Sequence, residues 1–154
     1  MENLTLNALF QQILIGLSRT TILFMVASGL TLVLGVLRIP NVFHGSLYMI
    51  GAFLTYTVAQ YFGFGTIGFW VGLAVAPLLV ALISIAIERG ILRTLYDREH
   101  LMLLLFTFSI SMVLSDAVKF VWGAKFRSMS VPPFFEGALD ILGMPFPRYN
   151  LFLL

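Results

Sequence analysis

The stretch Gly29-Leu-Thr-Leu-Val-Leu-Gly-Val-Leu-Arg-Ile-Pro-Asn-Val-Phe-His-Gly-Ser-Leu-Tyr-Met-Ile-Gly51 decides the fold, because an apolar helix is interrupted in it and then begins again. Pro40 ends a helix at or before the preceding residue, since its ring clashes with the previous turn and it has no N–H to donate. Asn41 then stands where an N-cap is expected, with a side-chain oxygen that can accept from the next turn. We therefore predict a broken helix that begins again at Asn41.

The composition is that of a membrane protein. The 154 residues are 60% hydrophobic and 10% charged, with a mean hydropathy of +1.00, whereas soluble domains are typically about 25% charged. A net charge of +2 is too small to indicate a nucleic-acid partner, and the absence of cysteine excludes disulfides and thiolate metal sites. Because irregular backbone at membrane depth is tolerated only inside protein or beside a wet cavity, the interruption is the first candidate for a solute path.

Apolar runs predict an all-α, polytopic membrane protein with a broken second span. A span needs about 20 mostly apolar residues, and we expect four spans and the start of a fifth, near residues 13–37, 42–62, 67–87, 101–122 and 149–154. Gly63, Gly65 and Gly68 signal the turn between the second and third spans. Residues 123–148, which contain four prolines, are expected to form a loop. The chain is then expected to stop inside its fifth span.

Arginines indicate the orientation in the membrane. Arg89, Arg93 and Arg98 fall in the short loop between the third and fourth spans, and short loops rich in Lys and Arg are usually cytoplasmic. We therefore expect the N-terminus and the glycine turn to be extracytoplasmic.

Two spans have small residues at intervals of four, which lets helix backbones approach closely. They are Ala27, Thr31 and Gly35 in the first span, and Gly68, Gly72 and Ala76 in the third. We interpret both ridges as packing faces inside one subunit; a homodimer seam is the alternative.

Polar residues of the second span form one stripe, because His44, Tyr48, Gly51 and Thr55 follow helical spacing. Ionisable groups inside a span tend to mark pathways, and the candidate pathway residues are Asn41, His44, Gly45, Tyr48 and Gly51. The alternative is that His44 bonds a backbone carbonyl freed by the break. A metal site is not expected, since no carboxylate accompanies His44.

Other polar groups give no support for an enzyme. Asp116 and Lys119, three residues apart, predict an ion pair, and Ser109, Ser111 and Ser115 are expected to bond helix carbonyls. The sequence has no catalytic triad, paired carboxylates, phosphate-binding glycine loop or metal-ligand cluster.

The stretch over residues 29–51 resembles the signature of branched-chain amino-acid ABC transporter permeases, in which Asn-Phe-Ala-His-Gly is followed by Tyr-Met-x-Gly-Ala. Glu88-Arg89-Gly-Ile-Leu-Arg93-Thr-Leu is similar to the family's cytoplasmic-loop motif Glu-Arg-x-x-x-Arg-Pro-Leu, and Trp122-Gly123 and Pro145-Phe-Pro-Arg-Tyr149 match further along. Residues 1–154 would then be the N-terminal part of a permease domain about twice as long, truncated before the segment that docks on the ATPase.

The resemblance implies an inner-membrane subunit of a bacterial importer that carries leucine, isoleucine, valine or related small amino acids and amides. It further implies that the chain binds no cofactor, because ATP is hydrolysed by partners. Those partners would be a second permease, two cytoplasmic ATPases and an extracytoplasmic binding protein. Two alternatives stay open: a structural or assembly membrane protein, and half of a secondary transporter. The broken polar span disfavours the first, and the lack of a mid-span carboxylate disfavours the second.

Overall fold

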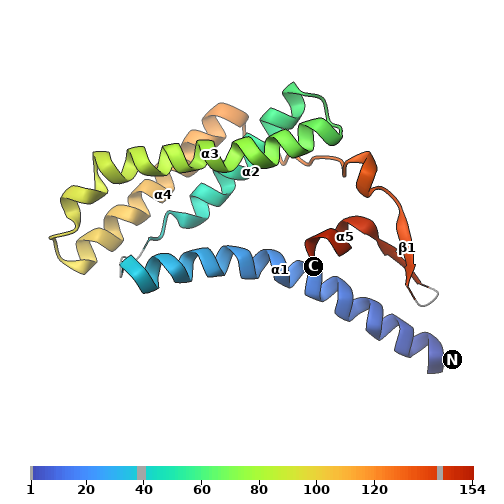
Figure 1. Ribbon diagram of the computed structural model, residues 1–154. Helices are drawn as coiled ribbons and strands as arrows, with labels where there is room; N and C mark the ends of the chain where they lie inside the picture. Colours follow the sequence, from blue (N-terminus) through green and yellow to red (C-terminus); the bar gives the residue numbers. More distant parts are fainter. Residues whose placement is uncertain (1, 38–40, 142–143) are drawn as a thin grey trace. The chain divides into compact units, whose positions relative to one another are not determined.

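The computed structural model describes residues 2–37, 41–141 and 144–154, which are mostly helical (Figure 1). The long helices are α1 (Glu2–Leu37), α2 (His44–Tyr61), α3 (Thr66–Gly90) and α4 (His100–Trp122). The shorter elements are the 3-10 turns η1 (Leu92–Leu95) and η2 (Pro133–Phe135), the strands β1 (Ala138–Ile141) and β2 (Met144–Pro147), and the helix α5 (Arg148–Leu153).

The chain forms two compact units. One comprises Met1–Ser28 with Val131–Leu154, and the other comprises Gly29–Ser130. The second unit contains the end of α1, the interruption and the helices α2, α3 and α4, and it therefore contains every candidate pathway residue.

Within the second unit, α2 lies antiparallel to α3 at very short range (Figure 1). A Cβ built on Gly72 would lie 3.1 Å from the carbonyl oxygen of Thr55, and one built on Gly68 would lie 2.9 Å from that of Ala59. Gly68, Gly72 and Ala76 are all buried. The prediction that this small-residue ridge packs inside the subunit is confirmed.

The ridge predicted on the first span has a different environment. No described atom lies within 4 Å of the place where a Cβ on Gly35 would be. The packing of Ala27, Thr31 and Gly35, including the homodimer alternative, stays a prediction.

The glycine turn between α2 and α3 is confirmed. Helix α2 ends at Tyr61 and α3 begins at Thr66, and the amide of Gly65 donates to the carbonyl of Gly63 at 2.8 Å. Gly63 has a φ of +82°, a left-handed conformation that costs glycine little and other residues more.

Three helices in the described part of the chain are long and apolar enough to cross a membrane: Ala8–Val36, Thr66–Gly90 and His100–Trp122. Helix α2, where we expected the second of four spans, is not among them. It has only 18 residues, which rise about 27 Å, and His44, Ser46 and Gln60 are among the polar residues that lower its hydropathy. Four spans are therefore not confirmed.

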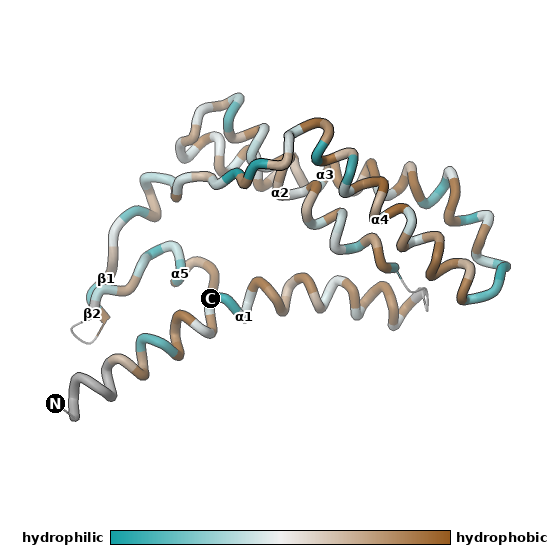
Figure 2. The backbone as a smooth tube through the Cα atoms, turned by 180° about the vertical axis from the view of Figure 1, so that it is seen from behind, coloured by the Kyte–Doolittle hydropathy of each residue, from teal (hydrophilic) through white to brown (hydrophobic). Residues whose placement is uncertain are grey.

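The three apolar helices leave most of their surface uncovered. Only 6%, 11% and 17% of their most apolar windows are buried within the chain, and Figure 2 shows hydrophobic residues along their length. Such faces are suited to lipid or to other membrane helices, because soluble monomers rarely expose large contiguous apolar patches.

The expected loop over residues 123–148 contains a hairpin that the sequence analysis did not predict. Strands β1 and β2 pair antiparallel, with Leu139 opposite Phe146. Helix α5 follows where a fifth span was expected to begin, and the rings of Phe135 and Phe152 lie 4.6 Å apart. In the same unit, Gln11 donates from Nε2 to the carbonyl of Pro145 at 3.5 Å.

The close contact between α2 and α3 generates a prediction. In Gly68→Ala the new Cβ would collide with the carbonyl oxygens of Ala59 in α2 and of Gly63 in the turn that follows α2, and overpacking of this kind costs about 1–3 kcal/mol. We expect a lower midpoint of thermal unfolding in detergent. Gly90→Ala in the same helix is the matched control, because no described atom lies within 4 Å of its Cβ position. A Gly68→Ala chain as stable as the wild type would contradict the close packing.

Candidate functional site

The interruption lies between the end of α1 at Leu37 and the start of α2 at His44. Arg38 and Pro40, on which the predicted break rests, lie outside the described residues. The prediction that Asn41 caps the second helix is wrong. Phe43 occupies the N-cap position, no side chain caps the helix, and the amide of Leu47 donates to the carbonyl of Phe43 at 3.1 Å.

The helix begins after Phe43 and not after Asn41 because the side chain of Phe43 is buried in the core of the unit. Its side chain is 1% exposed and clusters with Leu47, Leu92 and Leu103. Burying such a side chain contributes about 1.5–3 kcal/mol, whereas an N-cap hydrogen bond contributes about 1 kcal/mol. Burial therefore outweighs the capping preference and sets the first residue of α2.

Asn41 is left with an unusual polar atom. Its Oδ1 is buried and accepts no hydrogen bond from the described residues. A buried acceptor without a donor costs about 1–3 kcal/mol. The site therefore has an unmet capacity to accept a hydrogen bond.

His44 follows in the first turn of α2 and lies against α1. A Cβ built on Gly29 would be 3.2 Å from His44 Nε2 and 3.3 Å from Cε1. Among the described residues, no backbone carbonyl accepts a hydrogen bond from the His44 side chain. The alternative in which His44 bonds a carbonyl freed by the break therefore stays a prediction, because residues 38–40 lie outside the described residues.

The structure divides the predicted polar stripe into two parts. Tyr48 is 56% exposed, and Gly45 has open space around its Cβ position. Gly51 instead lies beside Val80 of α3, and Thr55 packs on Gly72 and donates to the carbonyl of Gly51 at 2.8 Å. Gly45 and Tyr48 thus lie on an exposed face at the start of α2, whereas Gly51 and Thr55 lie on the face that packs against α3.

A second set of polar contacts joins α2 to α4 and was missed by the sequence analysis. The hydroxyls of Ser46 and Ser111 are 2.8 Å apart, and Trp122 Nε1 donates to Thr57 Oγ1 at 2.7 Å. The two contacts are eleven residues apart in both helices, so α2 and α4 run in the same direction. The equal spacing of hydrogen-bonding residues in two apolar runs, Ser46 and Thr57 in one and Ser111 and Trp122 in the other, is the signal that could have revealed them.

The other serines of α4 behave as expected. Ser109 donates to the carbonyl of Leu105 at 2.9 Å, and Ser115 donates to that of Ser111 at 2.8 Å. Ser111 itself differs from the expectation, because its hydroxyl meets α2.

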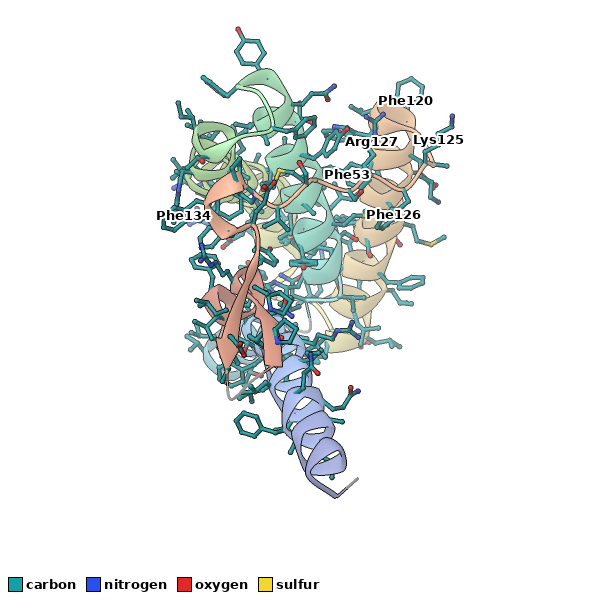
Figure 3. All side chains as sticks on the ribbon, turned by 90° about the vertical axis from the view of Figure 1, so that its right-hand side faces the viewer. Phe53, Phe120, Lys125, Phe126, Arg127 and Phe134 are labelled. Carbon is teal, nitrogen blue, oxygen red and sulfur yellow. The ribbon has the colours of Figure 1, made fainter. Side chains whose placement is uncertain are left out.

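Aromatic and basic side chains gather where α2 and α4 end (Figure 3). Arg127 donates from Nη2 to the carbonyl of Trp122 at 2.9 Å, and its guanidinium lies 5.4 Å from the centre of the Tyr56 ring. Phe120 and Phe126 are 92% and 94% exposed. The predicted ion pair is confirmed nearby, with Lys119 Nζ 3.0 Å from Asp116 Oδ1.

The predicted cytoplasmic-loop residues lie at the junction of α3 and η1. Arg89 is in the last turn of α3, where a cation favours the helix dipole, and Arg93 is in η1. Glu88 accepts a hydrogen bond from the hydroxyl of Tyr96 at 3.2 Å. Partial burial, helped by the negative charge of Glu88 and by this hydrogen bond, raises the pKa of Tyr96.

The described ranges contain no group of three or more His, Cys, Asp or Glu residues that could hold a metal ion. The site is instead an interruption in a helical membrane protein. It holds a buried acceptor on Asn41 that has no partner among the described residues, the imidazole of His44, and the exposed residues Gly45 and Tyr48. This architecture defines the class as a polytopic helical membrane protein.

Comparison with known families gives the particular family. The model of the family described as "Branched-chain amino acid transport system / permease component" matches residues 12–154, and the chain belongs to that family. No curated protein and no solved structure matches the chain. The protein is therefore a membrane permease component of a transport system.

Proposed function

We propose that this chain is a membrane-spanning subunit of an ATP-binding-cassette importer in the bacterial inner membrane. Its substrates are leucine, isoleucine and valine, or related small amino acids and amides. Membership of the branched-chain amino acid permease family over residues 12–154 supports this proposal, as do the three helices able to cross a membrane.

The proposal assigns the energy-consuming step to other subunits. A second permease completes the membrane pathway, two cytoplasmic ATPases bind and hydrolyse ATP, and an extracytoplasmic binding protein delivers the substrate. The chain itself binds no cofactor and catalyses no reaction. The family's description of its members as one component of a transport system supports the need for such partners.

The observation that carries the proposed pathway is the buried Oδ1 of Asn41, which accepts no hydrogen bond from the described residues. An amino acid carries an ammonium group whose N–H donors would satisfy this oxygen, and hydrogen bonds to charged donors are stronger than neutral ones. His44, Gly45, Tyr48 and Gly51 extend the pathway along α2. Accessibility of Tyr48 and Gly45 supports a solute route beside the first turns of that helix.

Uptake by the complete transporter tests this function. Vesicles that contain the chain with its partner permease, ATPases and binding protein should concentrate leucine, isoleucine or valine when ATP is supplied. In His44→Ala, uptake should fall more than the amount of protein in the membrane, because the imidazole acts on the solute. Equal losses of uptake and abundance would favour a structural role for His44. Uptake driven by a proton or sodium gradient instead of ATP would favour a secondary transporter.

Orientation in the membrane is a separate prediction. We propose that the loop around Arg93 is cytoplasmic and that the glycine turn and the N-terminus are extracytoplasmic, in accord with the positive-inside rule. Single cysteines can report this, because the chain has none of its own. In intact cells a membrane-impermeant thiol reagent should label Gly65→Cys, and it should label Thr94→Cys only after permeabilisation. The reverse labelling pattern would show that the chain has the opposite orientation in the membrane.

A further inference from the structure

We propose that Gly29 is a positioning residue for His44. Because Gly29 has no side chain, the imidazole can pack directly against the backbone of α1 at this position. The inference deepens the proposed function and rests on it, since His44 is taken to line the solute path. Both residues belong to the unit that runs from Gly29 to Ser130, so their contact lies within one compact body.

The geometry of this contact is specific. An added Cβ on Gly29 would lie 3.2 Å from Nε2 and 3.3 Å from Cε1 of His44. These separations are tighter than ordinary van der Waals contact, so the neighbour would have to shift by a few tenths of an ångström. Both atoms are at the far end of the side chain, and the imidazole, rather than the backbone, is therefore the group that would move.

Other glycines of α1 do not share this environment. Neither Gly16 nor Gly35 has a described atom within 4 Å of its Cβ position. A requirement for glycine that arose from general crowding of α1 would extend to these positions. Close approach to another group is a common reason for glycine in a helix, and at Gly29 that group is the ring of His44.

The orientation of the ring matters because its two nitrogens are chemically distinct. A neutral imidazole has one N–H donor and one acceptor, and the edge that carries Nε2 is the edge against Gly29. Binding groups need to be held within about 0.5 Å of their working geometry. The shift of a few tenths of an ångström that a Cβ imposes uses up most of this tolerance, and we therefore expect it to weaken, but not abolish, recognition of a solute at the interruption.

The first arm of the test measures uptake by the complete transporter. Gly29→Ala should raise the half-saturating substrate concentration by roughly three- to tenfold with little change in membrane abundance, and the matched control Gly35→Ala should leave it unchanged. In a His44→Ala background, Gly29→Ala should add no further loss, because the group that it displaces is gone. If Gly29→Ala lowers abundance instead, His44→Ala should restore it.

The second arm is independent of transport. With His100→Gln, His44 is the only histidine left in this chain. Its modification by diethyl pyrocarbonate can be followed by mass spectrometry of this chain, taken from membranes that contain the transporter. Gly29→Ala should speed this modification at least about twofold, a change of at least about 0.4 kcal/mol, because the added Cβ displaces the imidazole. Gly35→Ala should leave the rate unchanged.

Equal modification rates in Gly29→Ala and the wild type would overturn the inference, as would a cost of Gly29→Ala that persists without His44. Failure of the proposed function has a different signature. The wild-type complex would then fail to concentrate branched-chain amino acids, while the modification rates would still agree with the steric prediction.

Discussion

The burial of Phe43 is the constraint on which the interruption depends. Its ring is almost fully enclosed, and its partners come from the start of α2, from η1 and from α4. A single aromatic side chain at the N-cap of α2 thus joins this helix to η1 and to α4. Asn41 and His44 flank Phe43 closely in sequence, and its fixed position therefore determines where the unsatisfied oxygen and the imidazole lie.

The helices around Phe43 associate through close backbone contacts and interhelical hydrogen bonds. Lipid gives no hydrophobic drive between helices, so close backbone approach and hydrogen bonds take its place. Gly68 and Gly72 provide the approach between α2 and α3, and the Ser46–Ser111 hydroxyl contact joins α2 to α4. Helix α2 therefore packs along two faces, and Gly45 and Tyr48 lie on the exposed face at its start.

Sequence patterns predicted the features that depend on local chemistry. The turn at Gly63 and the pairing of Asp116 with Lys119 depend on neighbouring residues, and the structure agrees with both. The break in the second span stays a prediction, because Arg38 and Pro40 lie outside the described residues. The N-cap was wrong because Phe43 gains more from long-range burial than Asn41 gains from capping. The hairpin was missed because Pro145 and Pro147 signal a loop as readily as a short strand. The contact between Gly29 and His44 joins α1 to α2 across the interruption, and no local sequence pattern indicates such a contact.

The central claim is that the start of α2 lines the solute path, and water accessibility of single cysteines tests it most directly. In the assembled, active transporter, Gly45→Cys and Tyr48→Cys should react with a water-soluble thiol reagent, and leucine should slow both reactions. Ile50→Cys, on a buried face of the same helix, is the matched control and should stay unreactive with or without leucine. Absence of reaction at positions 45 and 48, or reaction that leucine leaves unchanged, would contradict a solute path at the interruption.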